Sequence, residues 1–359
     1  MSKPLLNCTS LSTPLTERHA MHTYDHATLQ EYLTAHVDGF ERLDSIEKFS
    51  DGQSNPTYKL TSGTRTFVLR AKPPGKLLKS AHAVDREFRV MSALAETYVP
   101  VPRMLHLSGD DSPMGTQFFV MEFLDGRIFW DPALPKLARG DRAPVYDAMN
   151  AALAALHDID PGRIGLADYG KPGNYFERQT ARWSSQYKAS QTTPLADADW
   201  VMDWLMDNMA ADDGASSIVH GDYRIDNMIF AEDRPDILAL LDWELSTLGH
   251  PLADLAYQCM HWRLPNAAEF KGLAGMDRTA IGLPTEDDYV AAYCDRRGIS
   301  VPPNWPFYLV FSYFRFLAIV QGVLKRALDG NASNPKNNQM IAGFVAMLAK
   351  DARKIAERS

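Results

Sequence analysis

The sequence predicts an α+β protein with two lobes, a small β-rich N-terminal lobe and a larger, mainly helical C-terminal lobe. The first observation is a change in period, because short β-rich runs dominate from about residue 40 to 125 and longer helical patterns follow. The second is the length of 359 residues, which suits one large domain or two ordinary ones. The third is a composition of 45% hydrophobic and 23% charged residues, which excludes a disordered or collagenous chain.

The N-terminal lobe is predicted to occupy residues 25–125. Residues 1–24 precede it and are expected to be a mobile leader, because they are polar and lack the apolar core of a signal peptide. The strands of the lobe are predicted in four β-rich runs separated by turn residues: FERLDSIEKFS, PTYKL, TFVLR and QFFVMEFL. One helix interrupts them at about Ser80–Thr97, and Ser80 is its expected N-cap.

The C-terminal lobe is predicted to occupy residues 126–359, where most runs suit helices. One segment differs, since Asn227–Phe230 and Ile237–Leu241 are short β-like runs around the turn AEDRPD. The apolar run Phe307–Leu324 is nearly long enough to span a membrane, but Arg315 lies in its middle. A guanidinium there would cost about 2.5–3.5 kcal/mol in a bilayer, so we expect a buried helix.

Charge and cysteine content exclude several classes of protein. The formal net charge of -8 argues against general binding to nucleic acid or to an anionic membrane. Three scattered cysteines are too few for a disulfide framework or a structural zinc site, so we expect a reducing compartment and a cytoplasmic protein. The sequence leaves the oligomeric state open.

The strongest chemical signal is the run His220-Gly221-Asp222-Tyr223-Arg224-Ile225-Asp226-Asn227, followed by Asp242. If the two β-like runs form a hairpin, residues whose numbers sum to about 469 lie opposite each other, and Asn227 faces Asp242. Asp222 lies in the preceding loop. Amide and carboxylate oxygens at one edge suit Mg²⁺ bridged to phosphates, which is a layout for phosphoryl transfer. The alternative is a His-Gly-Asp turn and a separate strand-end Asp with no shared task.

The pattern H-G-D-x-x-x-x-N followed by a strand-borne Asp resembles the signature of the aminoglycoside phosphotransferase family. The resemblance implies a protein-kinase-like fold and ATP- and Mg-dependent transfer of the γ-phosphoryl group to a hydroxyl of a small-molecule acceptor. It implies that Asp222 is the catalytic base and that His220 organises the loop. It also implies that Asn227 and Asp242 bind magnesium. Such chemistry needs positioning and charge neutralisation more than covalent catalysis.

The N-terminal lobe contains a matching set of phosphate-binding candidates. A hairpin of PTYKL and TFVLR would place the loop Ser50–Asn55 beside Arg70, and such a loop can present backbone N–H groups to phosphate. The resemblance implies that Arg70 contacts the α/β phosphates of ATP and that Glu87 supports it. The loop residues assigned by resemblance to the ATP phosphates are Gly52, Gln53, Ser54 and Asn55.

Two features of this lobe depart from the family pattern. The loop is not G-x-G-x-x-G, and Arg70 stands where the family has Lys, although Lys72 would share its strand face. Arginine stays charged and also binds phosphate, so the role survives the exchange. The alternative is an ordinary surface pair of Arg70 and Glu87.

Two further segments match the family. The run Phe118–Gly126 resembles its hinge, where the backbone of Glu122, Phe123 and Leu124 would bind adenine; a plain core strand is the alternative. Asp254 matches the segment G-x-P-x-x-D-L-A, and we expect it to cap a helix or brace the catalytic loop.

Three runs, PPGKLLKSAH, LHDID and GLADYGKPGNYFERQTARWSSQY, resemble a narrower branch, the kinase-like domains fused to acyl-CoA dehydrogenases. This resemblance implies a hydroxyacyl-CoA as a candidate acceptor. Four residues either line the acceptor site or form an ordinary helix face: Arg178, Gln179, Arg182 and Trp183.

Other functions fit the residues less well. A catalytically silent nucleotide-binding scaffold is opposed by the presence of Asp222, Asn227 and Asp242 together. A metal hydrolase would need more His ligands. A protein kinase would need an A-P-E segment. An antibiotic-modifying enzyme would need an acidic cleft for polycationic acceptors, which the distributed charge does not show.

Overall fold

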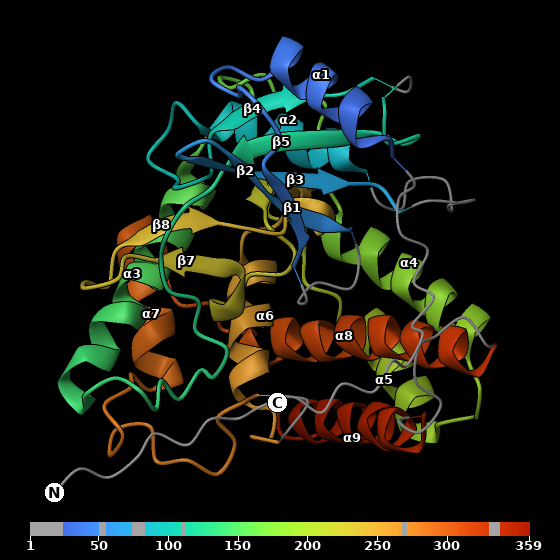
Figure 1. Ribbon diagram of the computed structural model, residues 1–359. Helices are drawn as coiled ribbons and strands as arrows, with labels where there is room; N and C mark the ends of the chain where they lie inside the picture. Colours follow the sequence, from blue (N-terminus) through green and yellow to red (C-terminus); the bar gives the residue numbers. More distant parts are fainter. Residues whose placement is uncertain (1–23, 50–54, 74–82, 110–111, 268–270, 330–337) are drawn as a thin grey trace, which may run out of the picture.

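The computed structural model describes residues 24–49, 55–73, 83–109, 112–267, 271–329 and 338–359. Figure 1 shows a sheet-bearing lobe above a larger helical lobe, as the sequence predicts. This arrangement confirms the α+β class. All but the last residue of the expected leader lies outside the described part of the chain.

The N-terminal lobe is built on an antiparallel sheet of five strands in the order β1-β2-β3-β5-β4. Its strands are β1 (Ser45–Lys48), β2 (Thr57–Ser62), β3 (Arg65–Ala71), β4 (Met104–Leu107) and β5 (Phe118–Glu122). The predicted hairpin of PTYKL and TFVLR is confirmed as β2–β3, where Thr57 pairs with Arg70.

The sheet is covered by one helix on each face, α1 (His26–His36) and α2 (Val84–Leu94). Side chains alternate along β3, so Phe67 and Leu69 join the core with α1, whereas Val68 joins the core with α2. The same alternation turns Arg70 toward α2, which carries Glu87. The alternation of side chains along β3 thus places the Arg70 guanidinium next to the Glu87 carboxylate inside the lobe.

Several element boundaries differ from the sequence expectations. Helix α2 begins at Val84 without a side-chain cap, and the expected cap Ser80 lies outside the described residues. Helix α1 was not expected, although the Asp25 carboxylate caps it by accepting from the Thr28 N–H at 2.7 Å. Strand β4 was also not expected, because all four of its residues are half-buried and a register shift breaks its ladder with β5.

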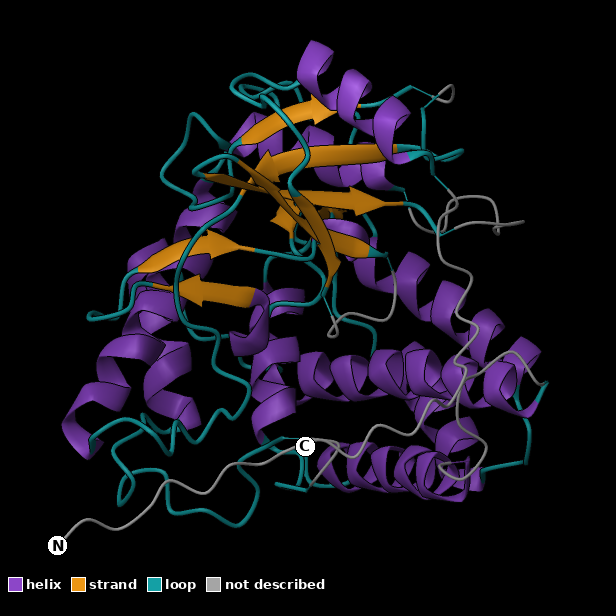
Figure 2. Ribbon diagram, in the orientation of Figure 1, coloured by secondary structure: helices purple, strands orange, loops and turns teal. Residues whose placement is uncertain are grey.

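The C-terminal lobe is mainly helical, and Figure 2 separates its helices from the strands. Its helices are α3 (Arg139–Asp158), α4 (Tyr175–Ser190), α5 (Ala196–Asp207), α6 (Leu252–Trp262), α7 (Glu286–Arg297), α8 (Trp305–Leu328) and α9 (Asn338–Ala356). Helix α8 packs against α4, α6 and α9, and thereby forms the centre of the lobe.

Helix α8 contains the apolar run in which the sequence places Arg315. It is long and apolar enough to cross a membrane, but 83% of its most apolar window is buried inside the protein. Arg315 is buried, lies over the ring of Tyr257 and donates a hydrogen bond to the carbonyl oxygen of Gly221. The interpretation of this run as a buried helix is confirmed, and its arginine supports the loop that contains Asp222.

Two short hairpin-like sheets frame that loop. Strands β6 (Ser217–Val219) and β9 (Thr247–Gly249) pair with each other, as do β7 (Met228–Phe230) and β8 (Ile237–Leu240). The β7–β8 pair lies between the five-stranded sheet and the helices (Figure 2). The loop from His220 to Asn227 therefore runs from one small sheet to the other, at the junction of the lobes.

The predicted hairpin register is wrong by one residue. Met228 pairs with Leu240, and the Leu241 N–H donates to the Asn227 carbonyl oxygen at 2.8 Å, so Asn227 lies opposite Leu241 and not Asp242. Nearest the turn Phe230 pairs with Ile237, and the register shift between Ile229 and Phe230 moves the pairing by one residue toward the predicted register without reaching it. Asn227 itself ends a short 3₁₀ turn, Ile225–Asn227.

Candidate active site

The loop that contains Asp222 has a backbone that requires glycine at position 221. Gly221 has φ of +84°, and a Cβ atom there would lie 2.5 Å from the Leu245 carbonyl oxygen. This close approach holds the loop against the turn Trp243–Leu245, which follows Asp242. The glycine of the motif therefore brings Asp222 and Asp242 into one region.

Asp254 braces the start of the same loop. Its carboxylate accepts from the backbone N–H of His220 at 2.6 Å and from that of Gly221 at 2.8 Å, and it lies 3.3 Å from Nε2 of His157. Asp254 is fully buried. Burial alone would raise its pKa, but the hydrogen bond from His157 and the two N–H groups lower it. The structure places Asp254 in the scaffold position that the sequence predicts, and we call this group the Asp254 brace.

His220 connects the loop to the strand that precedes Asp242. Its Nδ1 accepts from the Asp222 N–H at 3.2 Å, which leaves Nε2 to donate to the Leu241 carbonyl oxygen at 2.8 Å. His220 is buried and its ring lies against Trp243. Its contacts are those of a residue that organises the loop and not of a proton carrier for a substrate.

The Asp222 side chain is held by Asn227, Arg224 and Tyr257. The Asn227 Nδ2 donates to its Oδ2 at 3.0 Å and to its backbone oxygen at 2.9 Å, and the Arg224 Nε lies 3.3 Å from its Oδ1. Burial would raise the pKa of Asp222, but the Arg224 guanidinium and the Asn227 amide outweigh it and lower the pKa. Asp222 is therefore ionised at neutral pH and able to accept a hydrogen bond from a hydroxyl.

Asp242 takes a left-handed backbone conformation, with φ of +64° and ψ of +61°. Its Oδ1 accepts from Nη2 of Arg70 at 2.6 Å, across 172 residues of sequence. The side chain remains 32% exposed. The metal-ligand candidate of the C-terminal lobe is thus paired with the phosphate-binding candidate of the N-terminal lobe.

Arg70 also contacts Glu87 inside the N-terminal lobe. The Arg70 Nε lies 3.1 Å from Oε2 of Glu87, and the Asn55 Nδ2 donates to Oε1 at 2.8 Å. Only 1% of the Glu87 side chain is exposed, so the alternative of a surface pair is wrong. Burial raises the pKa of Glu87 to about 7, against the lowering effect of Arg70. We call Arg70, Glu87 and Asp242 the Arg70 bridge.

The remaining nucleotide-binding candidates are only partly described. Gly52, Gln53 and Ser54 lie outside the described residues. Lys72 lies away from the bridge, since its Nζ donates to Oε1 of Gln117 at 2.7 Å. Arg70, and not Lys72, is therefore the cation that meets Glu87.

The predicted hinge begins where β5 ends at Glu122. The Glu122 N–H donates to the Arg103 carbonyl oxygen at 3.0 Å, and its carboxylate accepts from the Arg103 N–H at 2.7 Å. Its N–H is therefore used within the protein. The Phe123 ring lies under Nζ of Lys59 at 5.0 Å. An adenine here would have to form its hydrogen bonds with the Glu122 carbonyl and with the backbone of Phe123 and Leu124.

A magnesium site in this region would depend on few protein groups. The described residues hold no cluster of three or more His, Cys, Asp or Glu side chains arranged for a metal. Mg²⁺ is commonly held by one or two carboxylates together with substrate phosphates and water. Two residues fit that donor set. One is Asn227, whose Nδ2 is bonded to Asp222 and whose Oδ1 is an acceptor atom, and the other is the partly exposed Asp242.

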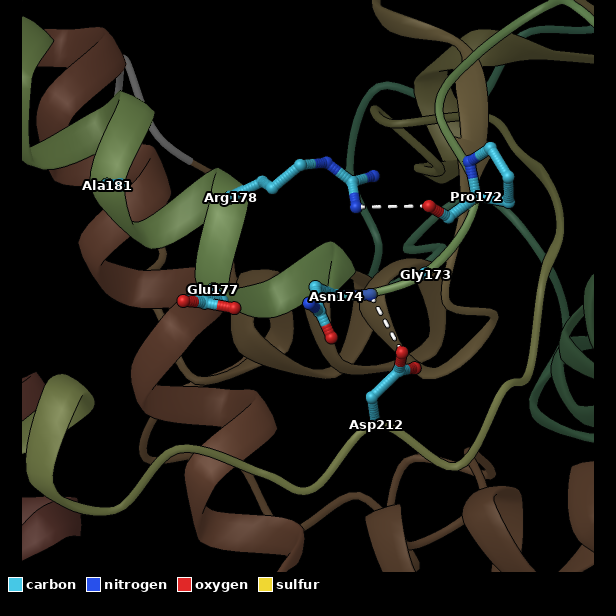
Figure 3. A pocket seen from close by; sticks show the side chains of 7 residues that line it. All are labelled: Pro172, Gly173, Asn174, Glu177, Arg178, Ala181 and Asp212. Carbon is cyan, nitrogen blue, oxygen red and sulfur yellow. Dashed lines mark hydrogen bonds between the residues drawn. The ribbon is translucent and has the colours of Figure 1, made fainter.

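The four acceptor-site candidates on α4 do not act as one group. Arg178 donates to the Lys171 and Pro172 carbonyl oxygens beside a shallow depression at the start of α4 (Figure 3). Trp183 is buried and lies under Arg182 at 5.1 Å, whereas Gln179 is half-buried. In Figure 3 the Asp212 carboxylate accepts from the Asn174 N–H at the helix start, which fills the place of an anionic ligand.

A second cavity, of about 300 Å³, adjoins the loop that follows Asp222. We call it the loop cavity. The residues that line it include Trp130, Arg224, His261, Trp262, Lys271 and Phe316. The sequence reasoning missed it, because these residues come from separate segments. The local signal was weak, because His261 and Trp262 are simply the last two residues of the buried helix α6.

Comparisons with known proteins agree with this geometry. The sequence model described as the phosphotransferase enzyme family, APH, matches residues 45–285. A human protein, acyl-CoA dehydrogenase family member 11, is 37% identical over 350 residues. The match covers 96% of this chain but 45% of that protein, so the chain spans less than half the length of this relative.

Solved structures give the same result. A crystal structure from Ralstonia eutropha, named only provisionally as an aminoglycoside phosphotransferase, is 44% identical in sequence and has a TM-score of 0.84. The match covers 94% of this chain and 99% of that one. A thermostable aminoglycoside phosphotransferase, solved with AMP-PNP and hygromycin B, shares the fold at a TM-score of 0.61 and 13% identity, over 91% of this chain and 98% of that one. With its bilobal, protein-kinase-like architecture and the Asp222 motif, the chain belongs to the phosphotransferase enzyme family, APH.

Proposed function

We propose that this protein is an ATP- and Mg-dependent small-molecule phosphotransferase that moves the γ-phosphoryl group to a hydroxyl of its acceptor. The observation that carries the proposal is the convergence of three segments on one place. Asn227 donates to Asp222 at 3.0 Å, and Arg70 contacts Asp242 at 2.6 Å and Glu87 at 3.1 Å. The two groups are linked through the backbone, since the N–H of Leu241, which precedes Asp242, donates to the Asn227 carbonyl oxygen at 2.8 Å. Charges of this kind neutralise and position phosphates, which is most of what phosphoryl transfer requires.

The nucleotide would lie between the lobes. The Arg70 guanidinium would contact the α/β phosphates, because Glu87, which accepts from Asn55, holds it at the end of β3. The Glu122 carbonyl and the backbone of Phe123 and Leu124 would bind the adenine. Because Arg70 touches Asp242 at 2.6 Å, a phosphate bound to Arg70 lies within reach of a metal bound to Asp242.

The metal would be held by Oδ1 of Asn227 and the Asp242 carboxylate. When bound, magnesium neutralises charge on the β- and γ-phosphates. The part of the chain itself is to keep both ligands in place: Asp222 fixes the Asn227 amide, and Arg70 occupies one oxygen of Asp242. Arg70 therefore has to share Asp242 with the metal when nucleotide binds.

Asp222 would orient the acceptor hydroxyl. Its lowered pKa keeps the carboxylate charged at neutral pH, so it accepts the hydroxyl proton as the acceptor oxygen bonds to the γ-phosphorus. The bond from that phosphorus to the bridging oxygen breaks, and ADP leaves with the electron pair. His220 keeps the Asp222 backbone in place through its Nδ1.

A hydroxyacyl-CoA is the candidate acceptor within this proposal. Its support is the resemblance to kinase-like domains fused to acyl-CoA dehydrogenases, together with the similarity to acyl-CoA dehydrogenase family member 11. Fold does not transfer specificity, so the acceptor needs a test of its own.

The first test is a thermal-shift series with ATP, GTP and ADP, each with and without Mg²⁺. A ligand at 100 times its dissociation constant adds about 2.7 kcal/mol to the stability of the folded state. We expect magnesium-dependent stabilisation by ATP in the wild type and loss of the magnesium-dependent part in Asp242→Ala. Asp236→Ala is the matched control, since Asp236 lies at the tip of the same hairpin and pairs with Arg234 in solvent.

Two outcomes would contradict the proposal. An Asp242→Ala variant with the same magnesium-dependent shift as wild type would remove Asp242 from the metal site. No shift with any nucleotide, in wild-type protein shown to be folded, would mean that the chain does not bind nucleotide and would contradict the proposed phosphotransferase.

A further inference from the structure

The loop cavity is placed to receive the acceptor. Its wall includes Tyr223, Arg224, Ile225 and Asp226, the four residues that directly follow Asp222 in the chain. Arg224 contacts both Asp222 at 3.3 Å and Asp226 at 3.0 Å. A molecule in this cavity therefore contacts Arg224, which in turn contacts the carboxylate that orients the hydroxyl in the proposed function.

Several aromatic side chains contribute to the walls of the cavity. Trp262 is buried, Phe316 is half-buried, and Trp130 is 56% exposed. The Trp130 indole borders a cavity whose lining also contains the rings of Trp262 and Phe316. These surfaces fit an apolar acceptor body.

His261 is a buried polar group of the cavity. It is only 9% exposed, and its Nε2 forms no hydrogen bond within the described structure. Its ring packs against Tyr257 and Phe316, with centroid distances of 4.7 and 4.9 Å. A buried polar atom without a hydrogen bond is unfavourable, so a ligand that supplies one gains affinity.

The imidazole of His261 is neutral. Burial and, after it, the Arg224 guanidinium lower its pKa to about 3. A neutral ring nitrogen pairs with a carbonyl oxygen or a hydroxyl and offers no charge to an ionic group. A carbonyl or hydroxyl group of the ligand therefore suits this position.

The charges around His261 do not suit a polycation. Asp226 lines the cavity but is bonded to Arg224, so the two charges offset each other. Lys271 adds a positive charge to the lining, and its Nζ lies 3.4 Å from Oδ1 of Asn266. The balance disfavours an amino sugar and favours a neutral or anionic ligand.

We propose that His261 determines acceptor specificity in the loop cavity, by hydrogen-bonding an uncharged carbonyl or hydroxyl group of an acceptor whose apolar body lies against Trp130, Trp262 and Phe316. The proposal rests on the proposed phosphotransferase function and deepens it. It assigns the acceptor to a class, hydroxylated molecules with an apolar body and no positive charge, and excludes polycationic aminoglycosides.

The test is isothermal titration calorimetry on the full chain in the presence of Mg·ADP. The probes are 3-hydroxyoctanoyl-CoA, free CoA and hygromycin B. We expect the wild type to bind the hydroxyacyl thioester at least tenfold more tightly than free CoA, because the acyl part fills the cavity. Hygromycin B should bind more weakly than either.

Two substitutions separate the hydrogen bond from the packing. His261→Phe keeps a ring of similar size but has no ring nitrogen, so affinity for the thioester should fall about tenfold. His261→Gln keeps an amide that can donate and accept, and should restore affinity to within about threefold of the wild type. His36→Phe, on α1 of the other lobe, is the control and should leave all three affinities unchanged.

Titration of each variant with Mg·ADP distinguishes this proposal from the proposed function. If the wild type does not bind Mg·ADP, the proposed phosphotransferase function itself is contradicted. Normal Mg·ADP binding with unchanged thioester affinity in His261→Phe would overturn the assignment of His261. A wild type that binds free CoA as tightly as the thioester, or hygromycin B more tightly, would overturn the acceptor class.

Discussion

The Asp254 brace and the Arg70 bridge both surround the proposed reaction centre, but they are built differently. Asp254 is fully buried, and its carboxylate is satisfied by two backbone N–H groups and His157, all within the C-terminal lobe. The bridge joins the two lobes through the pair of Arg70 and Asp242, and Asp242 is 32% exposed. One cluster is closed to solvent, whereas the other is open to it.

The difference separates fixed geometry from ligand response. Loss of one partner in the brace would leave buried N–H groups without an acceptor, so its arrangement is the same with or without ligand. In the bridge, water, metal or phosphate can replace a contact of Asp242 at little cost, because the group is partly solvated. The catalytic loop is thus prepared in advance, and the lobe junction adjusts when nucleotide binds.

Breaking the brace should have the largest effect. Asp254→Ala removes the acceptor of the His220 and Gly221 N–H groups and should destabilise the protein by about 3–5 kcal/mol, as for a buried charged group that loses its partner. Urea unfolding measures this loss. Asp213→Ala is the matched control, because Asp213 also faces a histidine, His250, but is largely exposed. Equal, small losses in both variants would contradict a structural brace.

Removal of the proposed base should lower activity and spare binding. Asp222→Ala is expected to reduce ADP release with a working acceptor by about 10²–10⁴-fold, the usual range for general-base catalysis. Affinity for Mg·ATP should stay within threefold, since the Asp222 backbone oxygen still holds the Asn227 amide at 2.9 Å. Near-normal turnover would show that Asp222 is not the base.

The bridge should make stability depend on pH in the opposite sense to the brace. The pKa of Glu87 is raised from 4.5 to about 7, so its contribution to stability is full below pH 4.5 and is lost as pH rises through 7. The lowered pKa of Asp254 gives a contribution that is present above its ordinary value of 3.8 and is lost as pH falls through the lowered pKa.

This dependence can be measured with Glu87→Gln, which keeps an oxygen for Arg70 and Asn55. The stability of the wild type relative to the variant should fall by about 3 kcal/mol between pH 4.5 and 7.5. Thermal unfolding across that range gives the difference. A difference that does not change with pH would mean that Glu87 stays charged throughout.

The smallest effect is expected from Arg70→Lys, which tests why arginine stands at this position. Arg70→Lys keeps the charge but not the fork that reaches Glu87 and Asp242 at once, so we expect a loss of about 1 kcal/mol. Arg89→Lys, in an exposed pair with Asp168, should cost less than about 0.5 kcal/mol. Denaturant unfolding compares the two, and equal losses would mean that the fork of Arg70 has no special role.

Local patterns in the sequence suffice for much of the fold and the motif. Alternation in TFVLR determines that Arg70 faces away from Leu69, and the turn AEDRPD predicts the β7–β8 pair. The spacing of His220, Asp222 and Asn227 puts them in one loop. Each of these relations spans a few residues, and strand period and turn chemistry act over that distance.

Local patterns failed where packing overrides period. The ladder of β7 and β8 is irregular, with a register shift between Ile229 and Phe230, so the turn alone does not determine its register. Strand β4 has no alternation of burial to detect. Helix α1 buries only Leu29 and Leu33 among its eleven residues, which is too weak a stripe to stand out.

The sequence by itself determined the two lobes, the loop motif and the identity of each charged candidate. Only the tertiary structure decided which charges meet: Arg70 with Asp242 across 172 residues, Asp254 with His220, and His261 beside the loop that follows Asp222. The physical reason is that contacts between distant segments depend on how helices and sheets pack together, and no local period encodes that packing.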